Sequence, residues 1–303
     1  MNLLITGAFT CANEQIKHIE SLGHKVVFMQ YEKDELPCDY SWVEGIIGNG
    51  IFLHHPIEKF SSLRFIQLTS AGFDRVPMDY IKKNNISIYN ARGVYSIPMA
   101  EFALSGVLYL FKQLKYFSNN QKAHIWAKHR GIIELFGKNV LIVGAGNVGA
   151  ECAKRFSLMG CSVHGVDAYP VKSDCFIDVL PMSELDGLLN ISDVVILTLP
   201  LTDETKGLFN NCKFAKFKDG AILVNISRGA VINTTDLIFA LESKLGGAVL
   251  DVFESEPLEE NSPLWDMENV VITPHNSFVG EGNNKRLFNI IVENLKEMGE
   301  YVE

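Results

Sequence analysis

The sequence predicts an α/β protein with two domains, each built around a parallel β-sheet. The chain has 303 residues, of which 47% are apolar and 21% charged, and a chain of this length usually folds as more than one domain. Its apolar runs are short and do not alternate with polar residues, which is typical of strands covered on both faces. Helical or turn-rich stretches separate most of the runs, as in sheets whose strands are joined by helical crossovers.

Two series of apolar runs predict the strands of the two sheets. The first series is LLIT (3–6), KVVFM (25–29), GIIG (45–48), RFIQLT (64–69) and ISIYN (86–90). The second series is NVLIVG (139–144), SVHGVD (162–167), DVVILTL (193–199), AILVNI (221–226), GAVLDV (247–252) and VVIT (270–273). A long stretch without strand character separates the two series, so we expect one sheet in each domain.

Two helices are expected outside this alternation. Residues 96–117 form an apolar helix in which Ser96 can cap the first turn and Pro98 fits inside it. Because that helix is apolar nearly all round, it is buried either inside the protein or at a subunit interface. Residues 280–302 return to a helical period, and we expect this last helix to pack on the first domain.

Composition excludes several classes of protein. The formal net charge is −9 and there is no basic run, which argues against nucleic-acid binding. No apolar stretch reaches the roughly 18 residues that cross a bilayer. The six cysteines have no C-x-x-C pairing, which favours reduced thiols over a metal site or disulfides. We therefore expect a cytoplasmic protein without metal, membrane or nucleic-acid partners.

A glycine motif after the strand at 139–144 predicts a dinucleotide site. Gly144, Gly146 and Gly149 form G-x-G-x-x-G, which allows a tight turn, close approach of a pyrophosphate, and close helix packing. Asp167 ends the next strand, 18 residues after Gly149, where a carboxylate can bind a ribose 2′-hydroxyl and repel a 2′-phosphate. The motif predicts NAD rather than NADP; the alternative is a glycine turn without a ligand.

Three polar side chains follow three strands of the second series. Arg228 comes after 221–226, Glu256 after 247–252 and His275 after 270–273. Ligands of open α/β sheets bind at the carboxyl ends of strands, and a guanidinium can hold a carboxylate through two hydrogen bonds. The alternatives are an arginine that ties two loops, a solvated acidic loop around Glu256, and a histidine at a domain seam.

At these residues the chain resembles the D-isomer-specific 2-hydroxyacid dehydrogenase family. The matching segments are TSAGFDRV, MAEFAL, GAGNVG, LPLTDETKGLF, LVNISRGAVI, LDVFESEPL and TPHNS, in this order. The resemblance implies two Rossmann-like or flavodoxin-like domains. A dinucleotide-binding domain at 95–276 would be inserted into a discontinuous substrate domain at 1–94 and 277–303.

The resemblance also implies roles for individual residues. Arg228 would bind the substrate carboxylate and polarise the 2-oxo group, and His275 would be the acid/base that Glu256 orients and keeps protonated. The segment Ser70, Ala71 and Gly72 would supply backbone N–H groups to the carboxylate. The implied cofactor residues are Gly144, Gly146, Asn147, Val148, Gly149, Asp167, Leu199, Pro200, Thr205, Ile226, Ser227, Arg228 and Asp251, the last at the nicotinamide carboxamide.

The implied activity is the NAD(H)-dependent reduction of a 2-oxo acid to the D-2-hydroxy acid, and its reverse. The implied assembly is a homodimer formed through the dinucleotide domain and the 98–117 helix. An NAD-sensing interaction protein of the corepressor type is the alternative; formate oxidation is disfavoured because that branch is expected to lack a glutamate at position 256. Asn49 lies where phosphate-using members tend to have a cation, which argues against 3-phosphoglycerate as the substrate.

Overall fold

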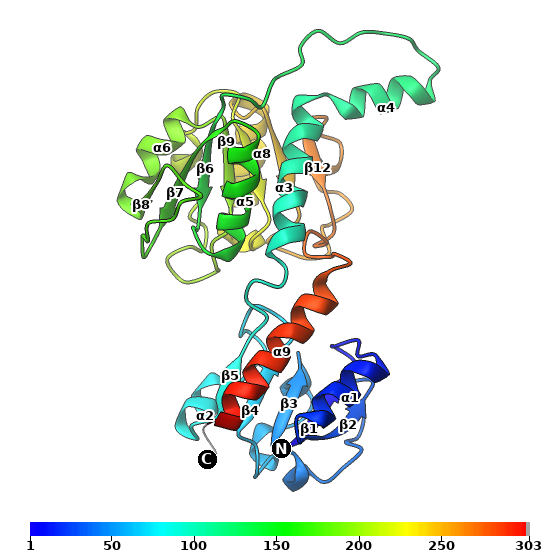
Figure 1. Ribbon diagram of the computed structural model, residues 1–303. Helices are drawn as coiled ribbons and strands as arrows, with labels where there is room; N and C mark the ends of the chain where they lie inside the picture. Colours follow the sequence, from blue (N-terminus) through cyan, green and yellow to red (C-terminus); the bar gives the residue numbers. More distant parts are fainter. Residues whose placement is uncertain (301–303) are drawn as a thin grey trace. The chain divides into compact units, whose positions relative to one another are not determined.

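The computed structural model describes residues 1–300, which divide into two compact units (Figure 1). Unit 1 contains Met1–Tyr95 and the segment from Gly280 onward, and unit 2 contains Ser96–Val279. The chain thus leaves unit 1 once and returns to it after completing unit 2. Both units are built on sheets whose paired strands are all parallel, so the predicted α/β fold class with an inserted domain is confirmed.

Unit 1 is a doubly wound sheet with helices on both faces. Its strands are β1 (Asn2–Thr6), β2 (Lys25–Met29), β3 (Gly45–Gly48), β4 (Phe65–Leu68) and β5 (Ser87–Tyr89), in the order β2-β1-β3-β4-β5. Its helices are α1 (Asn13–Ser21), α2 (Met78–Lys83) and α9 (Asn283–Glu300), with 3-10 turns at Tyr40–Trp42, Ile51–Leu53 and Ile57–Lys59. Every residue of β3 and β4 is buried, as expected for continuous apolar strands covered on both sides.

The C-terminal helix packs on unit 1, as predicted. Leu287, Ile291 and Leu295 repeat every four residues and are buried on one face of α9. They share one core cluster with Leu3 and Phe65 of the sheet. The helix therefore completes a domain that begins nearly 300 residues earlier in the chain.

Unit 2 is a seven-stranded sheet in the order β12-β11-β10-β9-β6-β7-β8. Its strands are β6 (Asn139–Val143), β7 (Ser162–Asp167), β8 (Asp178–Pro181), β9 (Val194–Leu197), β10 (Ile222–Asn225), β11 (Gly247–Leu250) and β12 (Val270–Ile272). Its helices are α3 (Ser96–Phe111), α4 (Leu114–Lys122), α5 (Asn147–Leu158), α6 (Leu185–Ile191), α7 (Asn211–Phe214) and α8 (Thr234–Ser243), with 3-10 turns at Met182–Glu184, Gly229–Val231 and Pro263–Trp265. Two apolar clusters cover its two faces, one built with α3 and α5 and the other with α6 and α8.

The apolar helix α3 lies inside unit 2, against α5 and the strands β10 and β11. A Cβ on Gly106 would lie 2.6 Å from Cγ1 of Val249, so the glycine allows the helix to approach the sheet closely. One face of the helix is therefore internal to unit 2, and its part in a subunit interface stays a prediction. The expected single helix over 96–117 is wrong in one respect, because Gln113 adopts a left-handed φ of 54° and separates α3 from α4.

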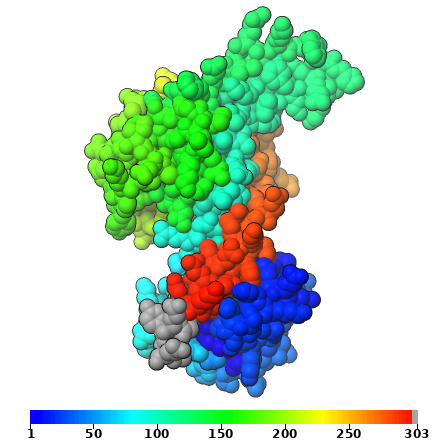
Figure 2. Space-filling model, viewed as in Figure 1, coloured from blue at the N-terminus to red at the C-terminus, as the bar shows by residue number. Residues whose placement is uncertain are grey.

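A segment of unit 2 that we call the arm, residues 114–132, stands away from the rest of that unit (Figure 2). It contains α4, none of whose residues is buried, and the extended chain that follows. The Trp126 side chain is 99% exposed, and Leu114, Ile125 and Ile132 are exposed as well. Within residues 1–300 no helix has both the length and the apolar character that a membrane crossing requires.

Candidate active site

The glycine loop lies between β6 and α5, where the sequence placed it. Gly144 has a φ of 103°, and a Cβ on Gly149 would lie 2.1 Å from the carbonyl oxygen of Gly144, so both positions require glycine. A Cβ on Gly146 would meet no atom within 4 Å, which leaves an open approach to the backbone just before α5 begins at Asn147. This arrangement fits a pyrophosphate bound at the N-terminus of a helix.

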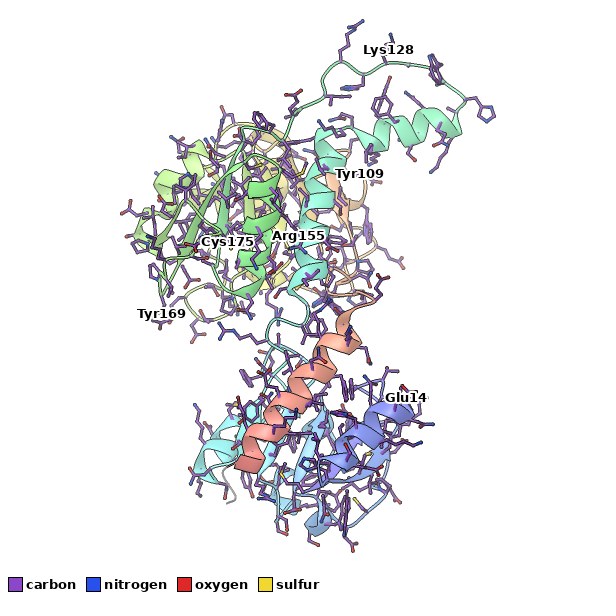
Figure 3. All side chains as sticks on the ribbon, in the orientation of Figure 1. Glu14, Tyr109, Lys128, Arg155, Tyr169 and Cys175 are labelled. Carbon is purple, nitrogen blue, oxygen red and sulfur yellow. The ribbon has the colours of Figure 1, made fainter. Side chains whose placement is uncertain are left out.

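Asp167 lies at the end of β7, beside this loop. Its Oδ2 accepts a hydrogen bond from the backbone N–H of Ala145 at 2.8 Å, and its Oδ1 accepts one from the N–H of Tyr169 at 2.9 Å. Tyr169 itself is exposed on the loop after β7 (Figure 3). The carboxylate is thus held next to the glycine loop, where it suits ribose hydroxyls and opposes a 2′-phosphate.

The other expected cofactor residues follow β9 and β10. A Cβ on Gly144 would lie 2.8 Å from the backbone nitrogen of Leu199, so the loop that continues to Pro200 runs alongside the glycine loop. Thr205 closes that loop by donating its hydroxyl to the Pro200 carbonyl at 2.7 Å. Ile226 and Ser227 are buried directly after β10. Because β10, β9, β6 and β7 are consecutive in the parallel sheet, these segments all lie at one edge.

Glu256 and His275 are within hydrogen-bond distance of each other, on loops that follow neighbouring strands. Nδ1 of His275 lies 2.9 Å from Oε2 of Glu256, and the two side chains are 44% and 38% exposed. The other oxygen of Glu256 accepts the backbone N–H of Phe253 at 3.1 Å, so the carboxylate is anchored to its own loop. Phe278 packs its ring against the imidazole edge-on, with ring centroids 6.0 Å apart. A paired, partly exposed carboxylate and imidazole can hold and transfer a proton.

Asp251, at the end of β11, holds the loop that carries His275. The side chain is 0% exposed, and Oδ1 accepts hydrogen bonds from the Thr273 hydroxyl at 2.6 Å and the Asn276 N–H at 2.7 Å. Oδ2 accepts the Ser277 N–H at 2.9 Å, and the Asp251 carbonyl accepts the His275 N–H at 2.8 Å. Asp251 therefore positions the loop that carries His275. Its contact with a nicotinamide carboxamide stays a prediction.

Arg228 follows β10, the strand beside β11. Its Nη1 donates to the Ser227 carbonyl at 2.8 Å, and its own carbonyl accepts from Nδ2 of Asn225 at 3.1 Å. A Cβ on Gly229 would lie 1.8 Å from the carbonyl carbon of Phe253, so the Arg228 loop packs directly on the loop of Glu256. Since β10, β11 and β12 are consecutive, Arg228, Glu256 and His275 follow three adjacent strands.

Asn225 was not among the residues expected from the sequence to shape the site. It is 1% exposed and its Oδ1 accepts both the backbone N–H and the hydroxyl of Ser227, at 3.1 and 2.8 Å. Together with its bond to the Arg228 carbonyl, this makes Asn225 the residue that shapes the turn after β10. A single polar residue at the end of an apolar strand was the available signal, because a buried amide requires partners.

In unit 1, Ser70, Ala71 and Gly72 form the loop after β4. The loop is held from behind, because the Ser70 carbonyl accepts the Ala91 N–H at 2.9 Å and the Ala71 carbonyl accepts from Nδ2 of Asn90 at 2.6 Å. In the part of the chain that the structure describes, the N–H groups of Ala71 and Gly72 have no protein acceptor. Two adjacent free N–H groups fit the oxygens of a carboxylate.

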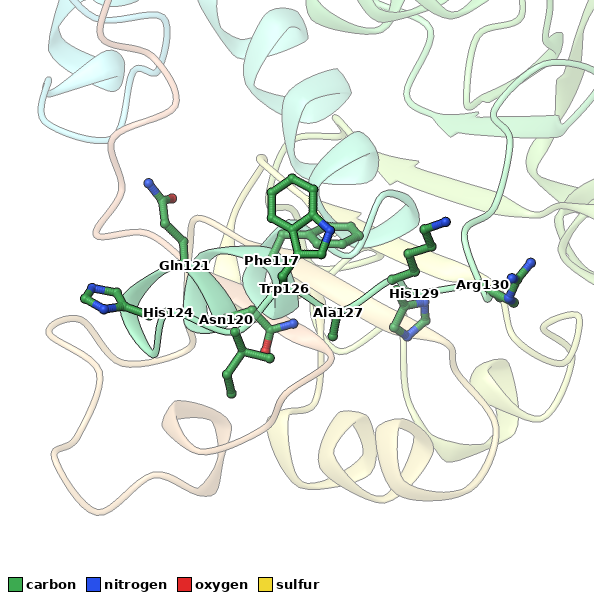
Figure 4. Close-up of a pocket in the computed structure, with 10 residues that line it drawn as sticks. Phe117, Asn120, Gln121, His124, Trp126, Ala127, His129 and Arg130 are labelled. Atoms are coloured by element: carbon green, nitrogen blue, oxygen red, sulfur yellow. The ribbon is translucent and has the colours of Figure 1, made fainter.

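A groove lies along the arm of unit 2. It has a volume of about 910 Å³, and its lining includes Phe117, His124, Trp126 and Arg130 (Figure 4). None of the expected catalytic or cofactor residues lines it. Residues 1–300 contain no group of three or more histidine, cysteine or acidic side chains arranged to hold a metal ion.

Comparisons with known proteins give a consistent result. The family model for the NAD binding domain of D-isomer specific 2-hydroxyacid dehydrogenases matches residues 104–277. A hydroxypyruvate reductase of Blautia hydrogenotrophica is 33% identical over 301 residues, which cover 93% of this chain and 91% of that protein. A D-3-phosphoglycerate dehydrogenase of Archaeoglobus fulgidus is 33% identical over 221 residues, or 72% of this chain and 42% of that protein. The crystal structure of a D-isomer specific 2-hydroxyacid dehydrogenase family protein from Aeromonas salmonicida superimposes with a TM-score of 0.83 at 29% identity, covering 99% of this chain and 95% of the other.

Proposed function

The chain belongs to the D-isomer-specific 2-hydroxyacid dehydrogenase family, and we propose that Arg228, Glu256 and His275 are the residues that perform its reaction. The reaction is the interconversion of a 2-oxo acid and a D-2-hydroxy acid with NAD(H). The observation that carries the proposal is the hydrogen bond of 2.9 Å between Glu256 and His275, at the edge of the sheet that also carries the glycine loop.

The proposed roles follow from the chemistry of the step. When bound, NADH supplies a hydride to C2 of the 2-oxo acid, and negative charge develops on the carbonyl oxygen. His275 donates a proton to that oxygen, which leaves a neutral hydroxyl; the imidazole then takes a proton from solvent. Because Nδ1 is bonded to Glu256, Nε2 is the nitrogen that is free to face the substrate.

Arg228 and the loop after β4 would hold the substrate's C1 carboxylate. The guanidinium offsets the carboxylate charge and the charge that develops beside it. In comparable sites such a group lowers the barrier by about 3 to 4 kcal/mol. The free N–H groups of Ala71 and Gly72 would bind the carboxylate oxygens. The residues fitted to hold NADH are those of the glycine loop, Asp167, and the loops after β9 and β10.

A screen of NADH consumption tests this function. It should include glyoxylate, hydroxypyruvate, pyruvate, phenylpyruvate and branched 2-oxo acids, with chiral analysis of each product. We expect oxidation of NADH with at least one of these acids and formation of the D-hydroxy acid only. Tight binding of NADH without turnover of any acid would contradict the proposal and favour an NAD-sensing interaction protein.

We further propose that the protein is a homodimer and that the arm of unit 2 contacts the second copy. The arm buries no α4 residue in its own unit and exposes Trp126 and Ile125 beside a groove of about 910 Å³. A short helix without a packed face is marginal alone, and exposed apolar side chains gathered in one segment are typical of an interface.

Light scattering coupled to size-exclusion chromatography tests the dimer. The double variant Ile125→Ser/Trp126→Ser should elute as a monomer, whereas the wild-type chain should have the mass of a dimer. Leu158→Ser is the matched control, because Leu158 is 87% exposed on α5 and lies outside the arm. A wild-type monomer, or a double variant that stays dimeric, would contradict the assignment of the arm.

We also propose that the protein works in the cytoplasm and without nucleic acid. All six cysteines are free thiols, which suits a reducing compartment. The net charge of −9 opposes binding to a polyanion.

A further inference from the structure

The strand order of unit 1 reverses between β1 and β3. In open parallel sheets, the crevice at such a reversal, outside the carboxyl ends of the strands, is where ligands bind. The loops at this place begin with Thr6 at the end of β1 and with Asn49 and Gly50 after β3. The neighbouring strand β4 leads into Ser70–Gly72, the loop proposed to hold the substrate carboxylate.

The carboxylate of Glu32, from the loop after β2, lies at this reversal of the strand order. Its Oε1 accepts hydrogen bonds from the Thr6 hydroxyl at 2.8 Å and from the Asn49 N–H at 2.7 Å. Its Oε2 accepts the Gly50 N–H at 2.7 Å. A Cβ on Gly48 would lie 2.7 Å from Oε1, so the backbone of β3 closes directly around the carboxylate. The donors that could bind an anion from solvent are already bonded to an anion of the chain itself.

The loops after β3 and β4 therefore differ in whether they can bind an anion from solvent. The N–H groups of Ala71 and Gly72 have no acceptor within the described residues, whereas those of Asn49 and Gly50 are bonded to Glu32. Neighbouring strands are about 5 Å apart, which is the span of a small dicarboxylate. A 2-oxo acid with its C1 carboxylate at the loop after β4 would bring its other end close to Glu32.

We propose that Glu32 is a specificity-determining residue that restricts the enzyme to 2-oxo acids whose distal group is neutral. A second carboxylate, phosphate or sulfonate would face the fixed negative charge of Glu32 and would find no free backbone donor there. The Oδ1 of Asn49 is buried without a partner among the described residues, which adds a further acceptor to this loop. This inference rests on the proposed function of the 2-oxo acid site.

One cation lies nearby and could oppose this effect. The Cδ of Arg75 lies 3.8 Å from the position of a Cβ on Gly50, but the Arg75 side chain is exposed. Exposed charges are screened by salt and water, whereas Glu32 is half-buried and held by three hydrogen bonds. The charge of Glu32 therefore dominates at this loop.

Two pairs of substrates test the inference, and the members of each pair differ by a distal anion. The first pair is 2-oxoglutarate and its 5-methyl ester, and the second is 3-phosphohydroxypyruvate and hydroxypyruvate. For the wild-type enzyme, kcat/KM should favour the neutral member by at least about tenfold in every pair that is turned over. In Glu32→Gln, which keeps the size of the side chain and removes its charge, the preference should fall by about tenfold.

Glu35→Gln is the matched control, because it changes the net charge equally and Glu35 is an exposed residue of the same loop. Its preference should equal that of the wild type. Equal turnover of neutral and anionic members by the wild-type enzyme would overturn the inference, even if Glu32→Gln failed to fold. The inference would also be overturned if a folded Glu32→Gln variant kept the wild-type preference. It would likewise be overturned if the wild-type enzyme preferred the anionic members and lost that preference in Arg75→Gln. If no 2-oxo acid is reduced at all, the proposed function itself is wrong, which distinguishes the two failures.

Discussion

His275 occupies a backbone conformation that is unusual for a residue with a side chain. Its φ of 49° lies in the left-handed region, which costs a non-glycine residue about 1 kcal/mol or more. Three hydrogen bonds from its loop to the buried carboxylate of Asp251 offset this cost and fix the imidazole beside Glu256. The sequence contained no signal for these hydrogen bonds, because Asp251 and the His275 loop come together only through the pairing of β11 with β12.

Arg228 is expected to contribute to turnover and not to cofactor affinity. Arg228→Ala removes the cation that offsets the substrate carboxylate, so kcat/KM for 2-oxo acids should fall by about 10²- to 10³-fold. The dissociation constant for NADH, measured by fluorescence titration, should stay within a few-fold of the wild-type value. Turnover that survives within about tenfold would mean that another group binds the carboxylate.

Asp167 is expected to set the preference for NADH. Its carboxylate would face a 2′-phosphate, so kcat/KM with NADH should exceed that with NADPH by on the order of 100-fold at fixed substrate. Asp167→Ala should narrow this ratio, because it removes the repulsion and the ribose hydrogen bond together. Equal use of both cofactors by the wild-type chain would refute the assignment.

At the scale of elements, the long apolar strands and the glycine loop could be predicted from the sequence, and two features could not. Strand β8 was missed because it is a four-residue edge strand that contains Pro181 and has no buried residue. The break between α3 and α4 was missed because Gln113 is not a residue that usually adopts a left-handed conformation. In both cases tertiary contacts within unit 2 determine the backbone conformation, against the conformation that the local sequence favours.

An ion pair ties three elements of unit 2 together at the amino ends of its strands. Asp193, just before β9, bonds to Nζ of Lys218 at 2.8 Å and to the N–H of Asn139 in β6 at 2.9 Å. Burial alone would raise the pKa of Asp193, but these hydrogen bonds outweigh it and lower the pKa from its ordinary value. A carboxylate whose pKa is lowered by folding stabilises the native state above its unfolded pKa of about 4.

Asp193→Asn should therefore lower the free energy of unfolding by about 1 kcal/mol at pH 7, measured by urea denaturation. The difference from the wild type should shrink as the pH falls through the lowered pKa, because the wild-type carboxylate becomes protonated there. Asp219→Asn is the control, since the side chain of Asp219 is 89% exposed in its pair with Lys244 and should matter little at any pH. A difference that is independent of pH would show that the charge of Asp193 is not the cause.

At the scale of the whole molecule, the insertion of one unit into the other was expected from the family resemblance, and it accounts for the two series of strands and the returning helix. The residues proposed for the reaction divide along the same line, because Ser70–Gly72 belong to unit 1 and Arg228, Glu256 and His275 to unit 2. The strand ends and their polar residues could be read from the sequence. Glu32 could not, because its bonds to Asn49 and Gly50 depend on how the loop after β2 folds over β3.

Unit 2 has its own sheet, with a core on each face, so residues 96–279 expressed alone should fold cooperatively and bind NADH. This fragment should not reduce 2-oxo acids, because it lacks the free N–H groups of Ala71 and Gly72. Circular dichroism during thermal unfolding, NADH titration and the turnover assay check the three statements. Full turnover by the fragment would show that unit 1 has no part in the site.

The pH dependence of 2-oxo acid reduction, compared between the wild type and His275→Gln, tests the assignment of the proton donor most directly. If His275 gives the proton, kcat for the wild type falls as the pH rises, and the variant is slow and nearly independent of pH. If the variant keeps the wild-type profile, another group moves the proton and the proposed roles of Glu256 and His275 are wrong.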